Sequence, residues 1–230
     1  MNRKLLAACM VIAAFSVVPS LAAAKPVLTH PTGTVLPVTT GGVPTKIKAT
    51  NVGNTKMTIS GLPTLECTTA VLTGDLHINE TTKGIEGEIT SAEFGGTGSK
   101  IAGDVEPECT GGAGPSGVTV TSLPWCIEAT EDNDNFALKG GKCTAATSPI
   151  TFDLSVTSIF GTITCKYIKN TKVTGTFTTH STGDAVGTIS EVGFARHESS
   201  ELCPSEGKLD MSFTLETDLT NEFKPLWISS

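Results

Sequence analysis

Apolar and polar side chains alternate through most of the chain after its first 24 residues. In residues 150–156 every second side chain is apolar, and the same holds for residues 209–215. A period of two predicts strands that bury one face and expose the other, as antiparallel sheets do. Shorter runs of the same kind cover residues 46–50, 65–69, 85–89, 118–120 and 163–165.

Turn-forming clusters separate these runs and support an all-β interpretation. Asn51-Val52-Gly53-Asn54, Gly140-Gly141 and Thr182-Gly183-Asp184 are typical of tight turns. Thr is also abundant, with 37 residues among 230, and it suits the outward face of a pleated sheet. We expect about a dozen strands and no amphipathic helix in the mature chain.

The first 24 residues have the pattern of a secretory signal peptide. Arg3 and Lys4 precede an apolar stretch from Leu5 to Val18, and Ala22-Ala23-Ala24 offers a small-residue cleavage site before Lys25. The sequence therefore predicts a secreted, extracellular protein. No later apolar run reaches 18 residues, so we predict no membrane span.

Charge excludes one large class of partners. The whole chain has a formal charge of −7. Removing residues 1–24 takes away two basic residues and no acidic one, which leaves 14 basic and 23 acidic residues, a net charge of −9. Because a nucleic-acid binder needs a basic stripe and this chain has none, we expect no nucleic-acid partner.

Six cysteines remain after the predicted cleavage, and they are the site residues that the sequence assigns. An even number in an oxidising compartment predicts three disulfides. Zinc is disfavoured because the sequence has no CxxC pair and no HExxH pattern. The six are Cys67, Cys109, Cys126, Cys143, Cys165 and Cys203.

An internal repeat narrows the pairing of these cysteines. Residues 87–94 (GEITSAEF) match residues 187–194 (GTISEVGF), and the segments around Leu72-Thr73-Gly74 and Val173-Thr174-Gly175 match as well. If each copy closes its own bridge, the disulfides are 67–109, 165–203 and 126–143. A pairing of equivalent cysteines, 67 with 165 and 109 with 203, also respects the repeat, but its loops are longer to close.

The predicted fold is therefore an antiparallel β-sandwich built from two similar, duplicated halves and stapled by disulfides. Its expected parts are a signal peptide (1–24), an extended lead-in (25–44), a first β half (45–130), an acidic connector (131–149) and a second β half (150–230). With few aromatic residues, each half is marginal alone, so we expect the halves to pack against each other.

No motif for nucleophilic, metal or cofactor chemistry is present, so we predict no catalytic, metal-binding or cofactor-binding residue and no cofactor. The acidic stretch from Glu131 to Asn135 lacks the DxDxDG spacing of a calcium loop, and we interpret it as a solvated loop. Carboxylates on strands alternate with apolar residues and should face water; these are Glu66, Glu86, Glu88, Asp153 and Asp210.

Three segments carry a resemblance to a known group of proteins: residues 45–69, the Leu123-Pro124-Trp125-Cys126 run, and residues 207–217. They resemble uncharacterised small, Thr-rich secreted proteins of soil actinobacteria, over nearly the whole mature chain. The resemblance implies an extracellular bacterial protein and carries over no catalytic residue.

These observations favour a secreted, non-enzymatic binding or cell-surface-associated protein, whose partner is an extracellular protein or a cell-envelope component. The alternative is a secreted hydrolase whose carboxylates come together only in the fold. An enzyme would place two carboxylates, or a His and a carboxylate, in one concave pocket. A binding protein would offer a shallow patch or an exposed sheet edge.

Overall fold

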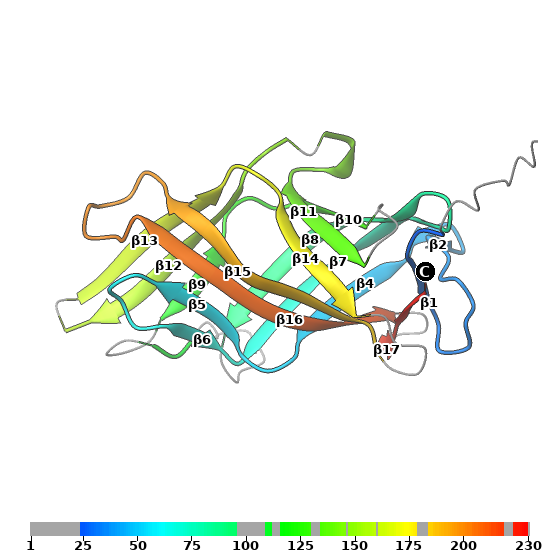
Figure 1. Ribbon diagram of the computed structural model, residues 1–230, viewed down its shortest axis with the longest axis horizontal. Coiled ribbons are helices and arrows are strands. Elements are labelled where there is room, and N and C mark those ends of the chain that lie inside the picture. The colour runs from blue at the N-terminus through cyan, green and yellow to red at the C-terminus, as the bar shows by residue number, and fades with distance from the viewer. Residues whose placement is uncertain are drawn as a thin grey trace, which may run out of the picture.

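The computed structural model describes residues 24–95, 109–111, 116–129, 134–145, 147–159, 161–178, 184–218 and 223–229 (Figure 1). The predicted signal peptide lies outside the described residues except for Ala24, and so do Glu131, Asp132 and Asn133 of the acidic stretch. Among the described residues, we find no helix with the length and apolar character that a membrane span requires.

The described part of the chain is all-β, as predicted, with a single short 3-10 helix, η1 (Cys143–Ala145). Every strand pairing is antiparallel, and strands such as β14 alternate strictly between buried and exposed side chains. The strands are β1 Val27–Thr29, β2 Thr39–Thr40, β3 Val43–Pro44, β4 Lys46–Asn51, β5 Thr55–Ile59, β6 Leu65–Cys67, β7 Thr69–Glu80, β8 Gly84–Gly95, β9 Gly117–Val120, β10 Trp125–Ala129, β11 Asn135–Gly140, β12 Ile150–Ser158, β13 Gly161–Lys169, β14 Val173–Thr178, β15 Val186–Arg196, β16 Glu206–Asp218, β17 Phe223–Pro225 and β18 Trp227–Ser229.

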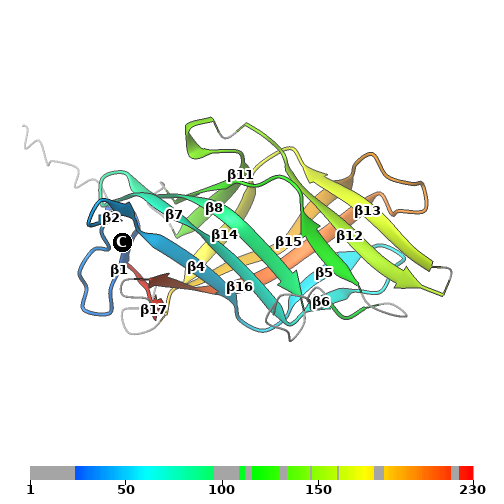
Figure 2. The same ribbon diagram turned by 180° about the vertical axis from the view of Figure 1, so that it is seen from behind.

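Four long strands, β7, β8, β15 and β16, run along the length of the molecule (Figures 1 and 2). Each of them takes part in the sheet at both ends of the molecule. At one end the pairing order β8-β10-β11-β14-β15-β16-β4-β7 returns to β8, so the sheet closes on itself. At the other end β9, β12 and β13 join β8 to β15, while β5 and β6 extend the sheet from β16.

The predicted halves do not form separate sheets. β16, from the second half, pairs with β4 and β5 of the first, and β9 of the first half pairs with β12 of the second. Such pairing satisfies backbone groups that two separate sheets would leave as exposed edges. The segments matched in the sequence lie on β7 and β8 in one case and on β14 and β15 in the other.

The predicted connector also contributes to the sheet. Residues 135–140 form β11, which pairs with β10 and β14 and buries Phe136 and Leu138. The alternating run that forms this strand is short, because acidic residues precede it and the Gly-Gly pair follows it.

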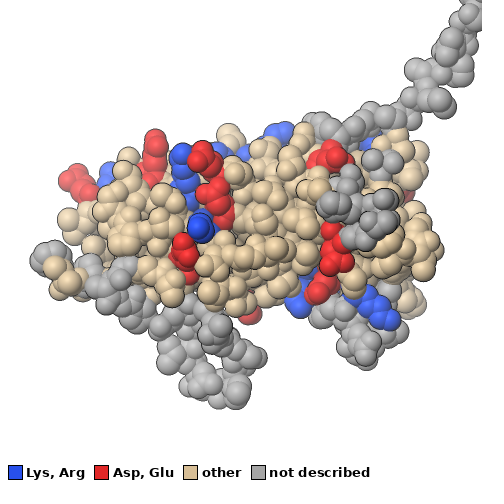
Figure 3. All heavy atoms as spheres, turned by 60° about the horizontal axis from the view of Figure 1, so that its bottom comes forward, with Lys and Arg blue, Asp and Glu red and all other residues tan. Residues whose placement is uncertain are grey.

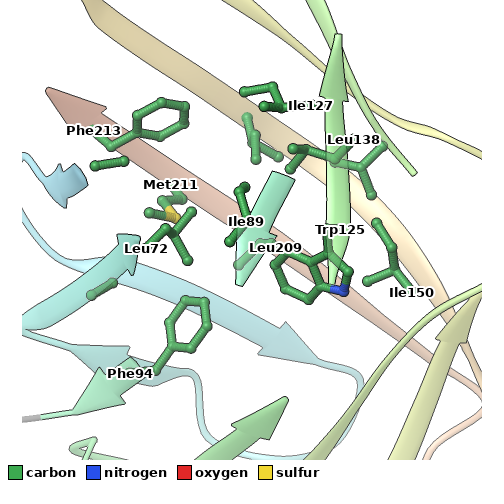
Figure 4. Packing of buried hydrophobic residues seen from close by; sticks show 14 of the residues in the cluster. Leu72, Ile89, Phe94, Trp125, Ile127, Leu138, Ile150, Leu209, Met211 and Phe213 are labelled. Carbon is green, nitrogen blue, oxygen red and sulfur yellow. The ribbon is translucent and has the colours of Figure 1, made fainter. Parts of the chain in front are cut away.

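The apolar faces of the strands fill the interior of the molecule. Trp125, Ile89, Leu209 and Ile150 point toward one another there (Figure 4). Two apolar cavities lie among such residues, with volumes of only about 30 and 20 Å³. Neither of these two cavities is large enough to hold a drug-sized ligand.

The predicted lead-in covers one end of this interior. β1 pairs with β18 near the chain's C-terminus (Figure 1). The buried Asn79 holds the lead-in, because its Oδ1 accepts a 2.8 Å hydrogen bond from the Leu28 N–H and its Nδ2 donates to the carbonyls of Leu28 and Leu36.

The structure contains three disulfides, and their pairings are those predicted from the repeat: Cys67–Cys109, Cys126–Cys143 and Cys165–Cys203. Disulfides of this structural kind indicate an oxidising environment, either extracellular or periplasmic.

Candidate functional site

A hollow on the outer surface lies beside a fork in the sheet. β15 pairs with β14 up to Thr188 and with β13 only from Ala195 onward. Between these points β15 has no strand partner on this edge among the described residues, while β14 continues to pair with β11 on its other edge. We call residues 189–194 of β15 together with residues 173–175 of β14 and the preceding Lys172 the β15 fork.

A groove of about 600 Å³ lies over the start of the β15 fork. The side chains that line it are mostly short and polar, and they come from the outward faces of four neighbouring strands and the residue before β14. They include Glu128 of β10, Asn135 and Lys139 of β11, Lys172, Thr174 and Thr176 from the β14 side, and Thr188 and Ser190 of β15.

The backbone of β15 faces the fork at two residues. The Arg196 N–H donates to the Ser205 carbonyl on the β16 side, whereas the His197 N–H donates to the Lys166 carbonyl of β13. Because backbone groups alternate in direction along a strand, Gly193 directs its N–H and C=O into the fork. No described strand pairs with Gly193 on that edge.

The same reasoning places a second pair of β15 backbone groups in the fork. The Ala185 carbonyl accepts from the Leu215 N–H, on the β16 side. Because backbone groups alternate in direction, the N–H and C=O of Thr188 face β14, where Thr188 pairs with Thr176. Two residues further on, the N–H and C=O of Ser190 face into the fork. Among the described residues, Ser190 also has no strand partner on this edge.

A β-bulge sets the direction of these groups. Ser190 and Glu191 together oppose Asp210 of β16, and Glu191 has a φ of 50°. A positive φ is unfavourable for a residue with a side chain, and bulges of this kind re-aim neighbouring groups. The Asp210 carboxylate holds the bulge by accepting hydrogen bonds from the Glu191 N–H (2.7 Å) and the Ser190 hydroxyl (3.3 Å).

The charges around the groove are few and specific. The Lys139 ammonium lies 2.6 Å from the Glu128 carboxylate, so these two charges neutralise each other. Lys172 is exposed, and no described acidic residue forms an ion pair with it. Among the described residues, the groove therefore has one basic side chain without an acidic partner, Lys172, on a protein that is acidic overall.

The carboxylates considered for hydrolysis do not gather in the groove. Glu128 is the one carboxylate among its described lining residues. Glu86 lies opposite Glu128 in the β8–β10 pairing but does not line the groove. The Glu88 carboxylate accepts from the Cys143 N–H (3.1 Å), and Asp153 lies opposite Lys166.

Glu66 lies elsewhere, on β6, where a hydrogen bond from the Asn54 amide and the neighbouring Lys56 ammonium lower the pKa of its carboxyl. All five strand carboxylates are half-buried on outward faces, as predicted.

On the face shown in Figure 3, acidic and basic side chains gather in clusters separated by wider uncharged areas. Within the described residues, His, Cys, Asp and Glu form no group of three that is placed to hold a metal ion.

Comparison of the chain with known protein families, with curated proteins and with solved structures found no match. The site therefore has to be interpreted from its own geometry.

The sequence did not indicate the residues of the groove. Thr174, Thr176, Thr188 and Ser190 alternate with apolar residues like any outward-facing residues of a strand. What sets them apart is their place beside the gap in which no described strand pairs with this edge of β15. The one local signal is the extra residue that the bulge adds to the alternation between Ile189 and Phe194.

Proposed function

We propose that the mature chain is a secreted, non-enzymatic binding protein that holds a polar ligand in the groove of the β15 fork. The observation that carries this proposal is the combination of a hollow, an unpaired strand edge and a lining of short hydroxyl-bearing side chains. Hydroxyl, amide and ammonium groups recognise polar ligands by hydrogen bonds and charge.

Secretion and the repeat belong to the same proposal. Three disulfides are consistent with an extracellular site of action, and a signal peptide at residues 1–24 would direct the chain there. A duplication would explain why the matched segments 87–94 and 187–194 occupy the two long strands β8 and β15. The proposed partner is an extracellular protein or a component of the cell envelope.

The groove is less suited to the alternative, a hydrolase. General acid–base chemistry on a sugar uses two carboxylates on either side of the bond to be cleaved. The single carboxylate among the described lining residues, Glu128, is held by Lys139. Turnover of a polysaccharide or peptide that a Glu128→Gln substitution abolishes would establish a hydrolase in its place.

A pair of matched substitutions tests the binding proposal. Thr174 and Thr58 are both exposed residues in the middle of a strand, but only Thr174 lines the groove. The mature protein and its Thr174→Arg and Thr58→Arg variants are tested against a glycan array and a displayed library of random peptides. We expect ligands that bind the wild type and Thr58→Arg but not Thr174→Arg. Binding that is insensitive to Thr174→Arg, or no binding at all, contradicts the proposal.

A further inference from the structure

The strand edge in the β15 fork offers more than a polar surface. Ser190 and Gly193 direct backbone N–H and C=O groups into the fork, and the described residues provide no strand partner for either. An unpaired edge of this kind is a template on which an extended polypeptide segment can add as a further strand.

The opposite arm of the fork presents a second edge. The Phe177 N–H donates to the Asp134 carbonyl on the β11 side, so alternation directs the backbone of Thr174 toward β15. The last pair between β14 and β15 on this side is Thr176 with Thr188, so no described strand pairs with Thr174 on that edge. A segment inserted between the arms would therefore find hydrogen-bonding groups on both sides.

The side chains of the groove favour a polypeptide over a glycan. Phe136 is the one aromatic residue among the described lining residues, and its ring is buried against that of Phe177, with centroids 4.5 Å apart. A sugar ring would have no exposed aromatic face on which to stack. Thr and Ser hydroxyls, in contrast, serve equally well as partners for the polar side chains of a peptide.

The dimensions agree with a short segment. The edge from Ser190 to Gly193 is four residues long, and an extended segment of that length spans about 13 Å. A groove of about 600 Å³ at the start of this edge gives such a segment a place to enter. The exposed Lys172 ammonium beside it would favour an acidic side chain on the incoming segment.

From these observations we infer that the ligand of the groove is an extended polypeptide segment, which adds as a strand to the edge of β15 between Ser190 and Gly193. This inference rests on the proposed binding function and specifies the class of its ligand.

The test uses the intact mature protein with its disulfides. Peptides that the protein enriches from the displayed random library are synthesised, and their affinities are measured with and without substitution of Gly193. A Cβ at Gly193 would meet no atom within 4 Å, so Gly193→Ala preserves both the space and the N–H. Gly193→Pro removes the N–H and is the informative variant. We expect Gly193→Ala to bind like the wild type and Gly193→Pro to bind about tenfold more weakly or worse.

A second measurement keeps the inference testable if Gly193→Pro does not fold. Amide hydrogen exchange of the wild type is recorded with and without the selected peptide. Strand addition should slow exchange at Ser190 and Gly193, whose N–H groups face the fork, and should leave Phe194 unchanged.

The outcomes separate the two proposals. If glycans bind in a manner sensitive to Thr174→Arg while no peptide does, the groove is a binding site but the inferred ligand class is wrong. If peptides bind without slowing exchange at Ser190 and Gly193, strand addition is wrong. If neither class binds, both proposals are wrong.

Discussion

Two long strands of the described chain, β8 and β15, each pass from one strand partner to another along one edge, and the residues beside the two gaps differ. β8 pairs with β10 up to Ile89 and with β9 at Phe94, just as β15 passes from β14 to β13. We call residues 90–93 of β8 and the linker 121–124 between β9 and β10 the β8 fork. The two forks lie on the strand segments that the sequence repeat matches.

The two forks differ in the residues that link their neighbouring strands. In the β8 fork, Leu123 packs against the core and Trp125 is buried, with its indole N–H 3.2 Å from the Ser122 hydroxyl oxygen. In the β15 fork, the equivalent linker consists of Asn170, Thr171 and Lys172, and all three are exposed. The architecture therefore allows a fork to be filled from within, and the open β15 fork is a property of its own sequence.

The largest expected effect is on the closed fork. Trp125→Ala removes a buried core side chain next to this fork, and we expect a loss of about 3–5 kcal/mol in the free energy of unfolding. Lys172→Ala, in the open fork, should change it by no more than about 0.5 kcal/mol, because this side chain is exposed and makes no ion pair with a described residue. Denaturant unfolding of the two variants measures both values. Equal effects would contradict the distinction between the forks.

Removal of a disulfide should have the next largest effect on the free energy of unfolding. Cys165–Cys203 ties β13, which pairs with β15 just beyond the open fork, to the chain after β15, with a sequence separation of 38 residues. Cys126–Cys143 holds β10, which pairs with β8 next to the closed fork, with a separation of 17. In the chain-entropy model, replacing each pair by alanine costs about 4 and about 3 kcal/mol respectively. Chemical unfolding of the two double variants tests the order, and the reverse order would show that strain or packing outweighs loop entropy.

A smaller, pH-dependent effect concerns β13, which pairs with β15 just beyond the open fork. Tyr167 of β13 lies opposite Arg196 of β15, and burial raises the pKa of its phenol although the Arg196 charge opposes this. Because the unfolded state then loses its proton first, Tyr167 should cost stability as the pH rises above about 10. Tyr167 is the single tyrosine, so ultraviolet titration reports on it alone. The Tyr167→Phe variant should lose less stability than the wild type over the same alkaline range, and an identical loss would refute the assignment.

The sequence predicted the parts of the fold that depend on local pattern. The alternation in residues 209–215 placed β16, and the matched segments together with the shorter loops selected the three cysteine pairings. The sequence did not predict which strands pair across the halves. The edges of β9 and β16 can pair with any strand that has a suitable length and buries the matching face. The groove depends on that pairing, so Thr174 and Ser190 could not be distinguished from other outward-facing residues.

Asn79 illustrates the same limit. In the sequence it is a polar residue near the end of an alternating run, and nothing nearby indicates its partners. In the structure it bonds to Leu28 and Leu36, 51 and 43 residues away. Side chains whose partners are this distant in sequence are identified only when the fold brings them together.

The central claim is that the edge of β15 is open in the free protein, and residue-resolved amide hydrogen exchange without ligand tests it most directly. We predict fast exchange at Ser190 and Gly193, and slow exchange at Arg196, whose N–H donates to Ser205 across a distance of 2.8 Å. Thr121 in the closed fork, bonded to the Thr151 carbonyl at 3.1 Å, should also exchange slowly. If Ser190 and Gly193 exchange as slowly as Arg196, the edge is already paired and the β15 fork is not an open binding site.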